Sequence, residues 1–231
     1  MKKLFLSLLA AASISSQAQD CTYWAPMEKG AEFEITHYNA KDKVDGSNVY
    51  QVTDVTSEGG KEIAHFKSIG YDKKDKETAT VEFDMFCENG MFYMEMTQFV
   101  SSEQLASMEG MEMTIEADDL AFPNELTVGQ TLPDGSVTIQ AKVEGMPGGI
   151  GGMTMTVTMT DRKVEAIETI EVNGTSVECY KMTYNSNLNM TMMNKTYPNI
   201  VWYAPNLGAV KTETYKENGK LIGYSLMTKM P

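Results

Sequence analysis

The chain has 231 residues, of which 42% are hydrophobic and 22% are charged, and its formal net charge at pH 7 is −13. This length is enough for one sizeable domain, and all-β domains of about this size are common. The acidic composition disfavours binding to nucleic acid and to anionic membrane faces, because both are polyanions. We therefore expect no nucleic-acid partner, and solubility is the simpler explanation for the acidity.

The N-terminal residues have the order of a secretory signal. Lys2 and Lys3 form a short basic region, and the apolar run 4–14 is too short to span a bilayer. Ser16-Gln17-Ala18 places small residues where a signal peptidase requires them. These features predict a signal peptide over residues 1–18 and export to the periplasm or the extracellular space.

Residues 19–231 are expected to form a single β domain without a transmembrane segment. Removal of the leader changes the formal net charge from −13 to −15, because two lysines leave with it. A lipid anchor on Cys21 is disfavoured, since Gln19 and Asp20 stand where small residues are needed. The alternative of an uncleaved membrane anchor is disfavoured by the shortness of the apolar run.

Strand signals dominate the rest of the chain, as runs rich in β-branched and aromatic residues. In chain order they cover residues 33–38, 49–55, 81–86, 91–99, 137–143, 177–184, 200–203, 210–215 and 221–228. Asn89-Gly90 predicts a two-residue hairpin turn between two of these runs.

A weak repeat occurs at 38–43, 71–76 and 215–220, where a tyrosine, a polar turn and a lysine follow one another. Asp, Asn and Gly favour turn conformations, so these segments predict three hairpin tips. A repeated charged binding motif is the alternative interpretation.

One short helix is expected, because Ser101-Ser102-Glu103-Gln104 fits a capping box and Gly110 supplies a stop. The glycine-rich stretch 146–152 predicts a loop. It lacks the lysine and the spacing of a phosphate-binding loop, so no cofactor is expected there or elsewhere.

The most informative pattern is the strict alternation of Met or Val with Thr over residues 153–160. Successive side chains of a strand point to opposite faces, so Met and Val share one face and Thr takes the other. Methionine makes a soft and adaptable apolar surface. The pattern predicts a concave face that binds a hydrophobic small molecule, a lipid or a partner segment. The candidate ligand-binding residues are Met94, Met96, Met111, Met113, Met153, Met155 and Met159.

Two other functions remain open for the same methionines. Thioethers suit Cu(I), although Met-x-Met spacing leaves the two sulfurs far apart without a third donor. A structural envelope-assembly protein would use the methionines only as core and would bind another envelope protein. A connected apolar cavity of roughly 300 Å³ or more would favour the ligand carrier.

Catalytic motifs are absent from the sequence. His37 and His65 are the histidines, and both stand in strand-like surroundings where a structural role is more common. The pair Asp118-Asp119 predicts a turn before Phe122-Pro123. We therefore expect a protein that is not an enzyme.

Cys21, Cys87 and Cys179 remain after signal cleavage, and an oxidising compartment permits one disulfide. Cys21 and Cys87 lie at element ends, whereas Cys179 lies within a strand. The sequence favours Cys21–Cys87 over the other two pairings but leaves the connectivity open.

Three segments carry a resemblance: 201–215, with Trp-Tyr-Ala-Pro-Asn-Leu-Gly at its core, 122–132 and 175–180. Together they resemble the TapB-like family of secreted Bacteroidota proteins, related to domain of unknown function 3108. The resemblance covers nearly all of the mature chain, and its three cysteines stand where that family's are expected. It implies a strongly curved antiparallel sheet similar to periplasmic lipoprotein carriers, and it transfers no catalytic residue.

The strand pattern leads to the same fold class from the residues alone. Many short antiparallel strands with one apolar face bury that face when the sheet curls on itself. We expect a mainly β protein, with a single curved antiparallel sheet or half-open β-barrel and one short helix.

Overall fold

The computed structural model describes residues 21–100, 111–142, 152–190 and 193–231. The predicted signal peptide, the predicted helix after Ser101 and nearly all of the glycine-rich loop lie outside these residues. Among the described residues, no helix has the length and apolar character needed to cross a membrane.

The described chain is built almost entirely of strands. They are β1 (Glu32–Asn39), β2 (Val44–Glu58), β3 (Lys61–Asp72), β4 (Glu77–Glu88), β5 (Met91–Met94), β6 (Glu112–Asp118), β7 (Leu120–Pro123), β8 (Gly135–Lys142), β9 (Met153–Val172), β10 (Thr175–Met190), β11 (Met193–Ala204), β12 (Gly208–Tyr215) and β13 (Leu221–Lys229). One 3₁₀ helix, η1 (Met96–Phe99), follows β5.

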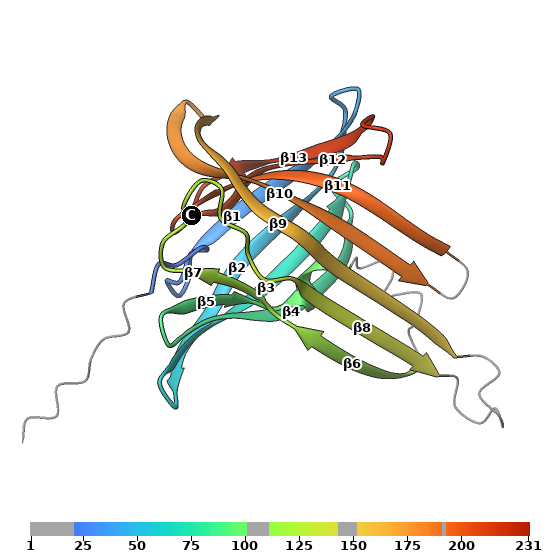
Figure 1. Cartoon of the computed structure of the whole chain (residues 1–231), viewed down its shortest axis with the longest axis horizontal. Helices are drawn as coiled ribbons and strands as arrows, with labels where there is room; N and C mark the ends of the chain where they lie inside the picture. The colour runs from blue at the N-terminus through green and yellow to red at the C-terminus, as the bar shows by residue number, and fades with distance from the viewer. Residues whose placement is uncertain (1–20, 101–110, 143–151, 191–192) are drawn as a thin grey trace, which may run out of the picture.

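All these strands belong to one antiparallel sheet, in the order β6-β8-β9-β10-β11-β12-β13-β1-β2-β3-β4-β5-β7. The sheet curls so far that it forms a nearly closed barrel, as Figure 1 shows. The two end strands, β6 and β7, are consecutive in the chain and mark the seam of the barrel. The predicted fold class, a mainly β protein with a single curved antiparallel sheet, is confirmed.

The predicted hairpin at Asn89-Gly90 is confirmed. Both residues have positive φ values, 52° and 74°, which the turn between β4 and β5 requires. Asn173-Gly174 repeats the device between the long strands β9 and β10, with φ values of 50° and 78°.

The repeat of tyrosine, polar turn and lysine marks three hairpin tips, as predicted. In the first tip the Asn39 amide donates to the Lys43 carbonyl, and the Lys41 amide donates to Asn39 Oδ1 at 2.9 Å. Asp72 accepts the corresponding bond from the Lys74 amide at 2.8 Å. The antiparallel order places the tips β1–β2, β3–β4 and β12–β13 at one end of the barrel.

The alternating run at the start of β9 has the predicted orientation. Met155, Val157 and Met159 are buried, whereas the threonines between them lie on the other face. On that outer face Thr138 and Thr156 hydroxyls are 3.1 Å apart across β8 and β9. A register shift of one residue would exchange the two faces, so the hydrophobic pattern fixes the register here.

Some predicted boundaries are wrong. The strand expected over 91–99 ends at Met94, and the next residues form η1. Asp118-Asp119 does not begin a turn, because Asp118 ends β6 and one residue later Leu120 begins β7. Only the surroundings of His65 were expected to be strand-like, and the full length of β3 was not, since two of its buried positions, Ala64 and Ser68, are small and give a weak strand signal.

An N-terminal plug, residues 21–27, closes the end of the barrel opposite the three tips. A disulfide joins Cys21 to Cys87 at the end of β4, which is the pairing that the sequence favoured. Trp24 is 1% exposed, and its indole nitrogen donates to the Pro123 carbonyl at 3.1 Å. Its ring contacts Tyr180 with a centroid separation of 5.4 Å, so the plug is tied to both sides of the sheet.

Candidate functional site

The barrel interior is not completely filled by side chains. An inner hollow of about 310 Å³ lies against the N-terminal plug. Its walls come from the plug, β1, β2, β4, β5, η1, β10, β11, β12 and β13 and from the turn before β12. The lining residues are Ala25, Phe33, Ile35, His37, Tyr50, Met85, Met94, Gln98, Phe99, Tyr184, Tyr203, Leu207, Gly208, Ala209, Thr212, Thr214 and Ser225.

A second hollow of about 310 Å³ adjoins the first. The two share His37, Tyr50, Gln98 and Phe99 in their linings. This outer hollow continues along β2, β3 and β4 to Gly70 and Ala79, near the tip that joins β3 to β4. The interior space therefore extends from the plug toward the end of the barrel that carries the tips.

Aromatic rings form much of the wall around the two hollows. Phe33 of β1 and Tyr50 of β2 are register partners, and their rings stack with centroids 4.8 Å apart. Tyr50 also meets the edge of Phe83 at 6.4 Å, and Phe83 stacks on Phe66. Such rings prefer stacked or edge-on contacts, which hold their positions and make a rigid wall.

Polar groups on the inner wall form a short hydrogen-bonded chain. His37 Nε2 lies 2.7 Å from Asn48 Oδ1, and Asn48 Nδ2 donates to Ser68 Oγ at 3.2 Å. Burial raises the pKa of the Tyr50 phenol, so that hydroxyl stays protonated at neutral pH. The hollow is therefore apolar with a few hydrogen-bonding groups on one side.

The seven candidate methionines do not form one surface around the hollow. Met94 lines it, whereas Met96, Met155 and Met159 are buried elsewhere in the core. Met111 and Met153 are partly buried against that core. Met113 is 43% exposed on the end strand β6 and does not belong to the buried inner surface.

The aromatic lining was missed at the sequence level. Phe33, Tyr50, Tyr184 and Tyr203 served only as strand signals, although they occupy inward positions of their strands. The available signal was the same period of two that identified the methionine face. The alternation identifies which residues point inward, but it does not show which of them pack against each other and which line a cavity.

The two histidines take different positions. His37 points into the barrel, as described above. His65 lies on the outside, where Nδ1 is 2.7 Å from Asp84 Oδ1 and Nε2 is 3.2 Å from the Thr56 hydroxyl. Within the described ranges, no group of three or more His, Cys, Asp and Glu side chains is placed to hold a metal ion.

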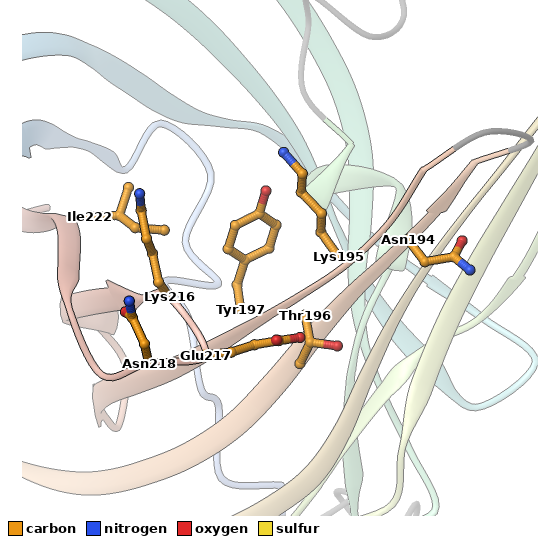
Figure 2. Close-up of a pocket in the computed structure, with 8 residues that line it drawn as sticks. All are labelled: Asn194, Lys195, Thr196, Tyr197, Lys216, Glu217, Asn218 and Ile222. Atoms are coloured by element: carbon orange, nitrogen blue, oxygen red, sulfur yellow. The ribbon is translucent and has the colours of Figure 1, made fainter.

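A third hollow, of about 550 Å³, lies at the rim near the β12–β13 tip, and Figure 2 shows its lining. Lys195, Tyr197 and Lys216 extend toward the same side of the ribbon, while Thr196 extends the other way. The side chains are spread over an open, charged surface, so this hollow lacks the enclosure of the interior one.

Comparisons with known proteins agree with the fold. An exported-protein candidate with a YmcC-like fold from Bacteroides fragilis is 20% identical, with a TM-score of 0.75 over 91% of this chain and 100% of its own. A lipoprotein candidate from Parabacteroides distasonis is 22% identical, with a TM-score of 0.75 over 92% and 100% of the two chains. At these identities the similarity establishes the fold alone.

No curated protein matches the chain. The family model described as DUF3108-like matches residues 28–227, which is most of the sequence. The protein therefore belongs to the DUF3108-like family.

Proposed function

We propose that this protein is a non-enzymatic, exported binding protein that holds a small hydrophobic molecule inside the barrel. The observation that supports it is the inner hollow, whose volume of about 310 Å³ reaches the lower end of small-molecule pockets. The proposed site is lined by aromatic rings, with Met94 as the one predicted methionine among them. The aromatic lining of the hollow thus replaces the methionine face of β9 as the surface expected to contact the ligand.

An unfilled hollow lowers the stability of a protein whose interior serves only as a hydrophobic core. Native interiors are packed to the density of organic crystals, and an unfilled space loses dispersion contacts on every side. Small residues stand at this wall, including Ala25 and Ala209. A larger side chain at one of these positions would fill the space, so the small residues favour a binding role.

Export is proposed on two grounds. Residues 1–18 have the order of a signal peptide, and the two similar structures are those of an exported-protein candidate and a lipoprotein candidate. The resemblance to TapB-like proteins within the family is a finer assignment of the same kind. N-terminal sequencing of the exported protein would test cleavage after Ala18.

Binding is tested with N-phenyl-1-naphthylamine, a neutral apolar probe whose fluorescence rises when it leaves water. We expect saturable binding by the wild type. Ala209→Phe should fill the hollow and weaken probe binding at least tenfold, with little loss of stability because the ring enters existing space. Val128→Phe is the matched control, since Val128 is 59% exposed and lies outside the hollow.

The competing function is an envelope-assembly protein whose interior is only core. Absence of probe binding by the folded wild type would support that function and reject ours. A large destabilisation by Ala209→Phe, without any change in probe binding, would also show that the hollow is not the binding site.

A further inference from the structure

Arg162 on β9 is buried, and the exposed Asp134 carboxylate acts on its charge only from a distance. Arg162 is 3% exposed and takes part in none of the ion pairs among the described residues. Its Nη1 donates to the Ala121 carbonyl at 3.2 Å and to the Pro133 carbonyl at 2.5 Å. Its Nη2 is buried and has no hydrogen-bond partner in the part of the chain that the structure describes.

This arrangement is unusual for an acidic protein. Buried charges are normally paired, because leaving water is costly and an opposite charge offsets part of that cost. The sequence has 32 acidic residues, yet among those that the structure describes none forms an ion pair with this guanidinium, and Asp134 favours its charged form only from a distance. Burial lowers the pKa of Arg162 to about 10, so the side chain remains a cation at neutral pH.

Ring contacts connect Arg162 to the inner hollow. The guanidinium carbon lies 4.6 Å from the centre of the Phe122 ring. Phe122 contacts Tyr203 with centroids 5.2 Å apart, and Tyr203 lines the hollow. Arg162 is thus one ring removed from a residue that faces the empty space.

Two phenol groups on the same wall lack strong partners. The Tyr203 hydroxyl donates to Met94 Sδ at 3.9 Å, and a thioether is a weak acceptor. The Tyr184 hydroxyl, also at the hollow, has no hydrogen-bond partner among the described residues. Burial raises the pKa of Tyr203 to about 12 and raises that of Tyr184 as well, so both remain donors.

We propose that the ligand of the inner hollow is an amphiphile with an apolar body and a single carboxylate, that Tyr184 and Tyr203 form its head-group site, and that Arg162 supplies positive charge from behind the Phe122 ring. This inference rests on the proposed binding function and specifies the class of ligand. The guanidinium supplies the charge that balances the carboxylate, and the phenols supply hydrogen-bond donors. One buried cation matches one negative charge, which favours a carboxylate over a doubly charged phosphate monoester.

The test compares two probes with the same body, cis-parinaric acid and its methyl ester, by fluorescence titration at pH 7.5. The wild type should bind the acid at least tenfold more tightly than the ester. Arg162→Gln keeps an amide donor but removes the charge, so this preference should disappear while ester binding stays within about twofold. Non-specific attraction cannot produce the preference, because the mature chain is expected to be strongly acidic and repels anions.

A second pair of variants keeps the test decisive if Arg162→Gln does not fold. Tyr203→Phe and Tyr184→Phe each remove one hydroxyl and retain the ring. Each should weaken binding of the acid several-fold and leave binding of the ester unchanged. An equal loss for both probes would show that the hydroxyls act on the shape of the hollow and not on the head group.

The possible results separate the two proposals. If neither probe binds the wild type, the binding function itself fails. If ester and acid bind equally well, the binding function stands and the carboxylate inference is overturned. If Arg162→Gln still prefers the acid, whether or not the variant is less stable, Arg162 serves only to connect β9 to β7 through its hydrogen bond to the Ala121 carbonyl.

Discussion

The barrel interior has two walls that differ in how they use the same strand pattern. On the methionine wall, Met155 and Val157 of β9 pack beside Ile139 and Val137 of β8, their register partners, and line none of the hollows described above. On the aromatic wall, Phe33 and Tyr50 stack beside open space. Unbranched methionine adapts to the gaps around it, whereas rings that hold one another in place leave the gap open.

This contrast changes the expected location of a binding site. A soft surface accommodates a ligand only if something keeps it from collapsing on itself. Rigid rings on the opposite wall and a tied plug at one end provide that support here. We expect changes on the methionine wall to lower mainly stability and changes on the aromatic wall to lower mainly ligand affinity.

The largest expected effect comes from releasing the plug that supports the aromatic wall. Cys21 and Cys87 are 66 residues apart in sequence, so removing their disulfide should cost about 4 kcal/mol through the unfolded state. Equilibrium urea unfolding of a Cys21→Ser, Cys87→Ser variant measures the loss. Because Ala25 of the plug lines the hollow, apolar probe binding should weaken as well. Unchanged stability would show that the plug docks without the covalent tie.

Next in size is truncation on the methionine wall. Met155 is 1% exposed, and Met155→Ala should cost about 3 kcal/mol through lost burial and the cavity left behind. Probe affinity should remain within about twofold of wild type. Phe33→Leu on the aromatic wall is the matched comparison, with a smaller stability loss of about 1 kcal/mol and a clear loss of affinity. Equal effects of both changes on affinity would remove the distinction between the walls.

A smaller effect concerns the pH dependence of stability at Glu95, which lies between β5 and η1. Burial is the main cause that raises the pKa of Glu95, and the nearby charges of Asp84 and Asp119 raise it further. Glu95 Oε2 accepts a hydrogen bond from the Asp84 amide at 2.9 Å. A raised folded-state pKa means that the proton stabilises the fold. The contribution is complete below the ordinary glutamate pKa and is lost as pH rises through the folded-state value.

The Glu95→Gln variant keeps an acceptor for the Asp84 amide and removes the titration. The free energy of unfolding of the variant minus that of wild type should therefore increase when the pH is raised from 4 to 7. The increase should be less than about 1 kcal/mol, since Glu95 is only half-buried. Urea unfolding at the two pH values measures this difference. A gain in the opposite direction would mean that interactions favouring the carboxylate outweigh burial.

The sequence predicted local features well where neighbouring residues determine the outcome. Asn89-Gly90 fixes its own turn, and the alternation around Met155 fixes its own face. The inner hollow could not be predicted, because it arises where β1, β2, β11 and β12 meet across long sequence separations. Arg162 likewise gave no signal, since its isolation depends on which carbonyl groups and rings surround it after folding.

The smallest effect tests whether water reaches the interior outside the hollow. Cys179 of β10 is a fully buried free thiol, and burial raises its pKa to about 11. Because the thiolate is the reactive form, iodoacetamide at pH 8 should leave Cys179 unmodified in the folded protein and label it rapidly in urea. Cys179→Ala should change probe affinity little, as the residue lines neither interior hollow. Labelling of the native protein at a rate that a neutral apolar ligand slows would place the opening to the interior at β10, away from the tips.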